Sequence, residues 1–366
     1  MQLGSARART DRERYDANPR HHIHVRSLVN CRRSSGNCAK SAAGAAGART
    51  ASSTLTGAGS TFVAPLVSQW ISPIGAAYGI ELQYSAIGSG GGVAAITQRT
   101  ADFGASDAPL TADQFSACKG CEQIPWALGA TAIMYNLPGV KNLLHMDGPT
   151  LARIFMGQIT KWNDPAIAKL NKGVSLPSTA ITVAHRSDNS GTTYNLTDYL
   201  SSVSPAWSSQ LSRGVAVNWP VGVGAKGSSG VAGVVSSTAG AIGYADVAYS
   251  LQAHLKYFAL ENRSGKFTTP GSRGILSAAS SDQKPAADNS LSIVNPPKKY
   301  ANAYPISTFT YAIVPLQSSK AADLKHFLFW AVTKGQTSQY TAKLRFVPLP
   351  KSVLVVAEKA IAKIHS

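Results

Sequence analysis

The chain has 366 residues, of which 44% are hydrophobic and 14% charged, and its formal net charge is +17. This length and apolar content allow one or two domains with a substantial core, and they exclude a chain that is disordered throughout. No apolar run approaches the roughly 18 residues that a membrane-spanning helix needs. After residue 50 no basic run is interleaved with aromatic residues, so we do not expect nucleic acid as a partner.

Residues 1–53 differ in composition from the rest. The first 50 positions hold ten lysines and arginines against three acidic residues, with few apolar side chains. We predict a disordered basic extension here. It lacks the apolar run of about 7–15 residues found in signal peptides, so no export signal is recognisable in it. The histidines at 21, 22 and 24 are read as a solvated tract, and we expect no metal site.

From Leu55 onward, strand patterns alternate with small-residue turns and helix patterns. Strands are predicted at 81–87, 101–106, 131–137, 180–184, 240–247 and 304–314. Helices are predicted at 92–100, 111–118 with Thr111 as cap, 147–157, 189–203, 321–335 closed by Gly335, and 353–364. Residues 262–300 are polar and turn-rich, which predicts a long surface excursion with little regular structure. The alternation of strands and helices indicates an α/β protein with parallel sheets.

Two of the four cysteines form the sequence "CKGC", Cys118 to Cys121, between a predicted helix and a predicted strand. A small disulfide, two free thiols and a zinc site are the three interpretations, and we favour the disulfide. Zinc would need a second pair of ligands, and none is near in the sequence. A disulfide would imply an oxidising compartment.

Three short turns, "GSTF" (59–62), "GSGGG" (88–92) and "SGTT" (190–193), each precede a predicted helix. The start of a helix exposes unpaired backbone N–H groups and a partial positive charge, which together suit an anion. Serine and threonine add hydroxyl donors, and glycine lets the backbone approach a ligand closely. Each turn alone could simply cap its helix, so the argument requires that the three converge.

Two charged residues sharpen this hypothesis. The fork of Arg186 suits a tetrahedral oxyanion, although an ordinary surface ion pair would also explain an arginine. Asp107 would repel a bare anion but could accept a hydrogen bond from an anion that carries a proton. Phosphate keeps a hydrogen near neutral pH and sulfate does not. The alternative is that Asp107 caps the turn that follows it.

Several motifs in this order resemble the substrate-binding protein of the bacterial ABC phosphate importer. They are "LTGAGSTFVAPLVSQW", "IGSGGGVAAI", "ADFGASDAPL", "ITKWNDPAIAKLN", "RSDNSGTTYNLTDYL", "NWPVGVGAKGSSGVAGVV", "GAIGYADVAY" and "YPISTFTYAIV", spread over roughly residues 54–360. The resemblance implies a two-lobed, type II-like periplasmic-binding-protein fold. Each lobe would be a mostly parallel sheet flanked by helices, and strands that cross between the lobes would form the hinge. We assign residues 54–131 with 301–366 to the first lobe and 132–300 to the second.

By its motifs, the resemblance implies that phosphate is bound by Thr61, Phe62, Ser89, Asp107, Arg186, Ser190, Gly191 and Thr192. It also implies that Asp188 holds the arginine, and that the protein is exported to the periplasm and works with the permease and ATPase subunits of the importer. We expect a monomer without cofactor or metal. Two features depart from the family pattern: Gly90 stands where relatives often carry a second serine, and His185 replaces a frequently basic residue.

Two other functions remain open from the sequence. A phosphate-ester hydrolase would need a base beside its nucleophile or a set of metal ligands, and only His185 is a nearby candidate base. A binding protein for another oxyanion, such as sulfate or molybdate, would have no use for the carboxylate of Asp107. We therefore predict no catalytic residue and no enzymatic activity.

Overall fold

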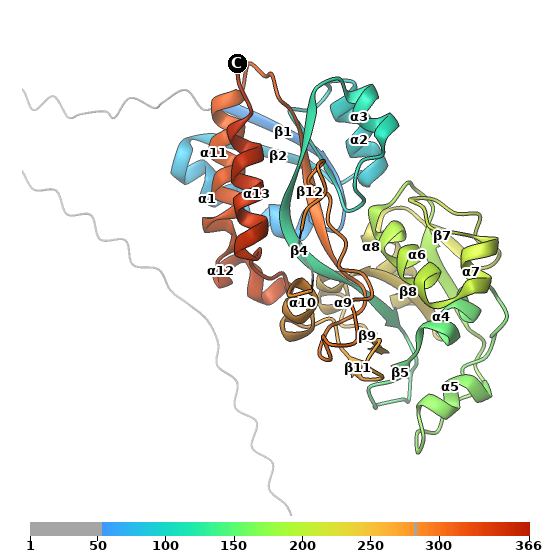
Figure 1. Ribbon diagram of the computed structural model, residues 1–366. Coiled ribbons are helices and arrows are strands. Elements are labelled where there is room, and N and C mark those ends of the chain that lie inside the picture. Colours follow the sequence, from blue (N-terminus) through green and yellow to red (C-terminus); the bar gives the residue numbers. More distant parts are fainter. Residues whose placement is uncertain (1–52, 282–283) are drawn as a thin grey trace, which may run out of the picture. The chain divides into compact units, whose positions relative to one another are not determined.

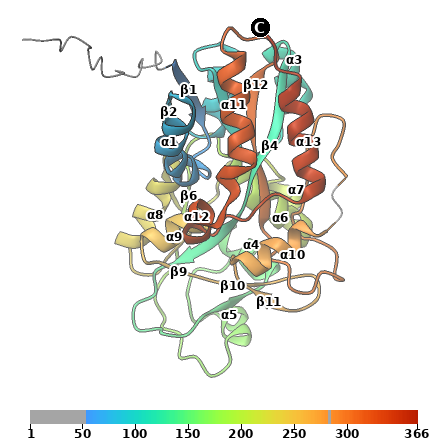
Figure 2. The ribbon, with the colours of Figure 1, turned by 90° about the vertical axis from the view of Figure 1, so that its left-hand side faces the viewer.

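The structure is a computed structural model that describes residues 53–281 and 284–366. The predicted extension 1–53 lies outside the described residues, except Ser53, which begins the first strand. The remainder is one compact α/β unit (Figures 1 and 2). In the part that is described, no helix has the length and hydropathy of a membrane span.

The main sheet contains nine strands, and eight of them follow the spatial order β2-β1-β3-β12-β4-β8-β6-β7. Their bounds are Ser53–Gly59 (β1), Ile80–Ser85 (β2), Phe103–Ser106 (β3), Cys121–Tyr135 (β4), Thr182–Arg186 (β6), Val223–Ala225 (β7), Ala241–Asp246 (β8) and Ser307–Pro315 (β12), with Lys256–Tyr257 (β9) beside β4. A smaller sheet comprises His145–Met146 (β5), Ala259–Glu261 (β10) and Phe267–Thr268 (β11).

The strand directions change where the two lobes meet. Within the first lobe β1 lies parallel to β2 and β3, and within the second β6 lies parallel to β7 and β8. The long strands β4 and β12 run antiparallel to each other and to their outer neighbours. The α/β class and the two-lobed fold predicted from the sequence are confirmed, with a sheet that is parallel at its outer parts and antiparallel at its centre.

Strand β4 belongs to both lobes. It pairs with β12 as far as Ala130 and with β8 from Thr131 onward. Figure 1 shows it running from the first lobe into the second. The lobe boundaries predicted from the sequence stay predictions; the change of partner along β4 falls at Ala130–Thr131.

The predicted strand 131–137 covers only the last third of β4, which ends at Tyr135. The first half of β4 contains Pro125, which has no N–H to donate to a neighbouring strand and so argues against a central strand. Pro125 lies at a β-bulge. Tyr311 of β12 is opposite Pro125, but the next residue of β12, Thr310, is opposite Ala127. Trp126 is the extra residue of this bulge, and its side chain is fully buried.

The helices cover both faces of the two sheet halves. Those in the first lobe are Ala64–Tyr78 (α1), Ser89–Thr97 (α2), Ala112–Cys118 (α3), Ala321–Val332 (α11), Ser338–Thr341 (α12) and Lys351–Ala362 (α13). The others are Gly148–Phe155 (α4), Pro165–Leu170 (α5), Gly191–Val203 (α6), Pro205–Gln210 (α7), Gly227–Ser237 (α8), Val247–Gln252 (α9) and Ser272–Ala279 (α10), and two 3₁₀ turns occupy Lys334–Gln336 and Ala342–Leu344. Figure 1 shows α1, α11 and α13 on one face of the first lobe's sheet and α2 and α3 on the other.

In the second lobe, helices α6 and α8 pack on opposite faces of β8. Ile242 and Tyr244 belong to the same apolar cluster as Leu196 of α6. Ala241 and Ala245 belong to the cluster that contains Val231 of α8. Neighbouring side chains of a strand point to opposite faces, so β8 presents one face to each helix. This arrangement places the starts of both helices beside the carboxyl end of β6 (Figure 1).

Two further sequence predictions need correction. The segment 262–300 contains β11 and helix α10, and the apolar face of α10, with Ile275 and Ala278, is fully buried. The turn-forming residues around this helix outnumber its few apolar residues, so the sequence pattern of the segment indicated a loop and not a helix. Helix α11 ends at Val332 rather than at Gly335, which lies in a 3₁₀ turn where its carbonyl accepts a hydrogen bond from the Trp70 indole at 3.1 Å.

The cysteine prediction is confirmed. Cys118 ends α3, Cys121 begins β4, and the two form a disulfide. Thr111 caps α3 as predicted: its hydroxyl accepts the Gln114 N–H at 3.2 Å, and the Gln114 side chain accepts the Thr111 N–H at 2.9 Å. Helix α3 is therefore capped at its start by Thr111 and joined at its end to the start of β4 by the disulfide.

Candidate anion-binding site

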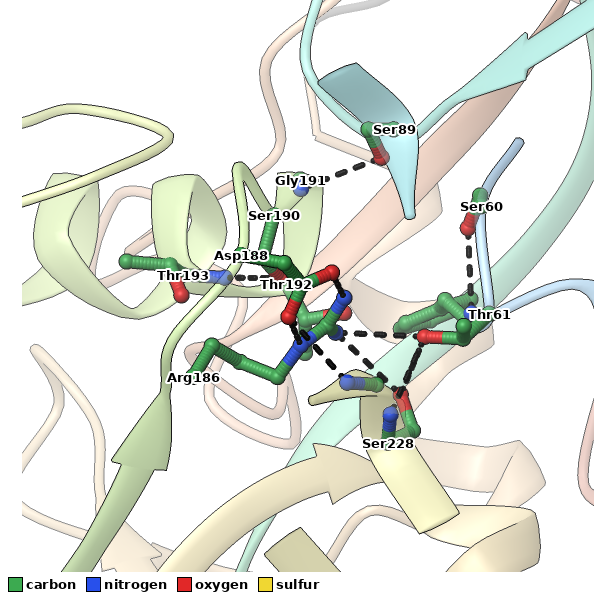
Figure 3. A network of polar contacts seen from close by, with 12 residues as sticks. Ser60, Thr61, Ser89, Arg186, Asp188, Ser190, Gly191, Thr192, Thr193 and Ser228 are labelled. Atoms are coloured by element: carbon green, nitrogen blue, oxygen red, sulfur yellow. Dashed lines mark hydrogen bonds and ion pairs between the residues drawn. The ribbon is translucent and has the colours of Figure 1, made fainter. Parts of the chain in front are cut away.

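The three predicted turns meet between the lobes, and a fourth turn joins them. Turns 59–62 and 88–92 come from the first lobe, and "SGTT" at the start of α6 comes from the second. The fourth is the start of α8, which carries Gly227 and Ser228. Figure 3 shows these segments around a single network of polar contacts.

Arg186 lies at the end of β6 and is buried at the centre of this network. Its Nε and one terminal nitrogen bind both carboxylate oxygens of Asp188, at 2.6 and 2.5 Å. Its other terminal nitrogen faces the hydroxyls of Thr61 at 3.1 Å and Ser228 at 3.5 Å (Figure 3). One edge of the guanidinium is therefore held by a carboxylate, and the other is directed to the meeting point of the lobes.

Asp188 is placed as the resemblance implied. Burial by itself would raise the pKa of this carboxyl, but the hydrogen bonds and the charge of Arg186, together with the Gly227 N–H, hold the pKa below its ordinary value. The Gly227 N–H donates to it at 3.1 Å. Asp188 is therefore an anion, and it offsets the positive charge of Arg186.

Asp107 follows β3 and is 2% exposed. Its Oδ1 accepts the hydroxyl of Ser60 at 2.5 Å, and its Oδ2 lies 3.5 Å from the hydroxyl of Thr192. Burial raises the pKa of Asp107 to about 6, although the bond from Ser60 and the charge of Arg186 act in the opposite direction. The carboxylate therefore lies between the two lobes and loses its proton at an unusually high pH.

Ser89 joins the lobes through its hydroxyl oxygen. This oxygen accepts the N–H of Gly191 at 3.0 Å and that of Asp107 at 3.3 Å. A Cβ on Gly191 would lie 2.6 Å from the Ser89 oxygen and 2.7 Å from the Asp107 backbone nitrogen. A side chain at position 191 would therefore force the first turn of α6 away from the first lobe.

The remaining predicted residues have local roles as well. The hydroxyl of Ser190 caps α6 by accepting the Thr193 N–H at 3.1 Å. The N–H of Phe62 donates to the Ser60 hydroxyl at 3.0 Å, and the Phe62 ring is buried edge-on against Phe346. All eight predicted residues lie in or beside the network, with Phe62 and Ser190 at its periphery.

The two departures noted in the sequence have structural explanations. A Cβ at Gly90 would collide with the Cβ of Asn189 across the lobes, so a second serine there would require Asn189 to move. His185 stacks on Trp219 with ring centroids 5.0 Å apart, and burial lowers its pKa. The imidazole is therefore held against the outer loop of the second lobe.

Sequence reasoning missed Ser60, Ser228 and Tyr249. The Ser228 hydroxyl lies 2.8 Å from that of Thr61, and the Tyr249 hydroxyl donates to the Thr61 carbonyl at 2.6 Å. The glycine-serine pattern of "GAKGSSG" (224–230) repeats that of the other three turns and could have revealed α8. Nothing local marks Tyr249, because its partner lies 188 positions away.

The site contains no arrangement typical of a hydrolase. Within residues 53–281 and 284–366, no group of three or more His, Cys, Asp or Glu side chains could hold a metal ion. The serines of the network pair with carboxylates, amides and other hydroxyls. Two lobes that meet around an arginine, a carboxylate and the amides of several helix starts define a two-lobed ligand-binding protein.

Comparisons with known proteins give the family. Residues 44–334 match the model of the PBP superfamily domain. The phosphate-binding protein PstS of Xylella fastidiosa (strain Temecula1) is 41% identical over 311 residues, covering 84% of each chain. That of Pasteurella multocida is 38% identical over 309 residues, covering 83% of this chain and 89% of the relative. The chain belongs to the PBP superfamily and, within it, to the family of PstS phosphate-binding proteins.

Solved structures show the same fold. A high-affinity periplasmic phosphate-binding protein (PfluDING) bound with phosphate superposes with a TM-score of 0.67 at 21% identity, covering 84% of this chain and 93% of the other. The phosphate-binding protein from Stenotrophomonas maltophilia gives a TM-score of 0.65 at 19% identity, with the same coverage. At these identities the likeness establishes the two-lobed architecture.

Proposed function

We propose that this protein binds inorganic phosphate between its lobes and delivers it to a membrane import complex of the ABC type. The family to which the chain belongs supports this proposal, since its curated relatives are named phosphate-binding proteins. The ligand would be held by Thr61, Phe62, Ser89, Asp107, Arg186, Ser190, Gly191, Thr192 and, in addition, Ser228. The protein acts as a receptor and not as an enzyme.

The observation that carries the proposal is the charge balance of the site. Arg186 is already paired with Asp188, and Asp107 adds a further buried carboxyl group. A fully deprotonated anion would face a carboxylate without a hydrogen between them, which is costly in a buried site. A phosphate that carries a hydrogen can donate it to Asp107 and accept hydrogen bonds from the amides and Arg186.

The proposed setting follows from the same family. The protein would be exported to the periplasm, act as a monomer and present its closed form to permease and ATPase subunits. The disulfide between Cys118 and Cys121 agrees with an oxidising compartment. Because donors from both lobes surround the ligand, phosphate would shift the population of the protein towards the closed state.

Calorimetric titration of the phosphate-depleted protein tests the proposal. We expect tight binding of phosphate and, near pH 8, rejection of sulfate by a factor of about 10⁴ or more. Comparable affinities for the two ions would contradict phosphate as the ligand. An aryl phosphate incubated with the protein, with and without divalent metal, should show no turnover, and turnover that disappears in Arg186→Ala would instead support a hydrolase.

A further inference from the structure

A small cavity lies behind Asp107. Its volume is about 40 Å³, and the residues that line it include Asp107, Tyr194, Asn195, Asp198, Arg213 and Thr308. Neither Arg186, Ser89 nor Thr61 lines it. The cavity therefore reaches Asp107 without bordering the arginine. A buried water needs about 10–15 Å³ and two to four polar partners, so this space is large enough for one.

Asn195 brings an unpartnered amide to this cavity. Its side chain is 1% exposed, and its Oδ1 lies 3.2 Å from the hydroxyl of Thr308, whose single hydrogen also has the Phe309 carbonyl as an acceptor at 2.9 Å. Among residues 53–281 and 284–366, its Nδ2 has no hydrogen-bond partner. A buried amide group without a hydrogen-bond partner is destabilising, so a bound water is expected beside it. If the two ends of the amide were exchanged, an acceptor would face the cavity, and water would satisfy it equally well.

The Asp107 carboxylate has hydrogen-bonding capacity left. Its Oδ1 takes the short bond from Ser60, whereas Oδ2 has only the Thr192 hydroxyl at 3.5 Å. A carboxylate offers about four lone-pair sites, so Oδ2 is poorly satisfied. Asn195 and Asp107 thus line one small cavity, each has a polar atom with unused hydrogen-bonding capacity, and the space is large enough for one bridging water.

We propose that Asn195 and Thr308 hold a buried water against Asp107, and that Asn195 is thereby a positioning residue for the recognition of the anion's hydrogen. The inference rests on the proposed function, because it assumes that Asp107 reads that hydrogen. The water accepts from the Asn195 amide and donates to the carboxylate. It stabilises the ionised form of Asp107, which is the form that accepts a hydrogen from the ligand and repels an anion without one.

The other ionisable groups around Asp107 come from every neighbouring element. They are Arg186 of β6, Tyr84 of β2, Asp246 at the end of β8 and Tyr249 of α9, with Asp188 beyond Arg186, and Tyr194, Asp198 and Arg213 along the cavity. Arg186 favours the ionised form of Asp107, and Asp246 opposes it where it is itself ionised. Asp198 and Arg213 form an ion pair with each other at 3.1 Å. The cavity water would add a neutral, directed donor to this set.

The route to solvent follows from the lining. Pro109, Tyr194, Arg213, Leu291 and Ser292 also line the large groove of about 1190 Å³ that borders α2 and α3. The cavity therefore adjoins the groove.

Sulfate binding as a function of pH measures this effect. Sulfate has no hydrogen to donate, so it should bind only where Asp107 is protonated and can itself donate. In the unmodified protein sulfate affinity should rise as the pH falls through about 6. Asn195→Leu replaces the amide by an apolar group of similar size and removes the water's anchor. We expect its sulfate profile to move to higher pH by about one unit.

Three comparisons make the test specific. Thr308→Val should move the profile in the same direction by a smaller amount, and it remains informative if Asn195→Leu does not fold. Ser201→Ala is the matched control, because Ser201 lies on the same helix with a buried, unpartnered hydroxyl away from the cavity, and its profile should not move. A high-resolution crystal structure of the unmodified protein should show a water between Asn195 and Asp107.

The outcomes separate this inference from the proposed function. If the unmodified protein fails to bind phosphate, the proposed function is wrong. If it binds phosphate selectively but the sulfate profiles of both cavity variants coincide with that of the control, the role of Asn195 is refuted and the proposed function stands. A crystal structure without a water at that position would refute it as well.

Discussion

Asp107 and Arg186 have opposite charges and opposite surroundings. Arg186 is paired on one edge by Asp188, and its remaining terminal nitrogen faces hydroxyl groups from both lobes. Asp107 makes no ion pair among the described residues, and burial raises its pKa to about 6. Above that pH it is ionised, while phosphate still carries a hydrogen that it can donate. At the scale of single residues, the proposed function therefore assigns selectivity to the carboxylate and affinity to the guanidinium and the amides.

Asp107→Asn should relax selectivity while preserving phosphate binding. The amide has nearly the same shape, but it can donate a hydrogen bond and carries no charge that repels sulfate. We expect the ratio of phosphate to sulfate affinities near pH 8 to fall by about a hundredfold or more. Calorimetry with both ions measures this ratio, and an unchanged ratio would mean that Asp107 serves only the turn.

Arg186→Ala should weaken phosphate binding by about a hundredfold. Hydrogen bonds to a charged group contribute about 1.5–3 kcal/mol each, and the variant also leaves Asp188 without its partner beside the anion. Arg273→Ala is a suitable control, since Arg273 is exposed on helix α10. If the two variants bound phosphate equally well, the guanidinium would lie outside the binding site.

At the scale of elements, helix starts and strand ends bring these groups together. Helices α2, α6 and α8 begin at the meeting point of the lobes, and each is at least nine residues long. Helix α9 contributes differently, because Tyr249 reaches from it to the backbone of Thr61 in the other lobe. The lobes are thus joined by direct bonds as well as by the crossing strands.

Tyr249→Phe should shift the protein towards its open form. It removes one hydrogen bond between the lobes, worth about 1 kcal/mol, and leaves the apolar packing of the ring. Phosphate affinity should fall about fivefold, because part of the binding energy is then spent on closure. Tyr340→Phe, on α12 against Trp330, is the control. Identical affinities for the two variants would show that closure does not depend on this bond.

At the scale of the whole molecule, buried carboxyl groups couple stability to pH. The pKa of Asp107 is raised from 3.8 to about 6, so its contribution to stability is complete below pH 3.8 and is lost as the pH rises through about 6. Asp188 acts in the opposite sense, since its lowered pKa gives stability above its ordinary value that is lost in acid.

The difference between the unmodified protein and Asp107→Asn isolates the first effect. Without phosphate, the free energy of unfolding of the variant relative to the unmodified protein should rise by about 2.4 kcal/mol between pH 4 and pH 7, since one pKa unit corresponds to about 1.4 kcal/mol and Asp107 is partly ionised in the unfolded chain at pH 4. Urea unfolding at several pH values measures this change. Parallel curves would mean that Asp107 keeps an ordinary pKa in the folded protein.

Features that depend on neighbouring residues could be predicted from the amino-acid sequence. The capping of α3 by Thr111, the placement of most helices and strands, and the small-residue turns all depend on neighbours within a few positions. The nature of the candidate site could also be predicted, because arginine, aspartate and helix-start amides have few uses in common besides anion binding.

Which of these groups meet, and which residues support them, became visible only in the folded protein. Thr61 and Arg186 are 125 positions apart, and Asn195 and Thr308 are 113 apart, so no local pattern connects them. The full length of β4 also depended on long-range pairing, because β12 supplies the partners that Pro125 and the bulge at Trp126 require. Such contacts form only when distant segments have been brought together, since the gain of each contact must exceed the entropy cost of closing the chain between them.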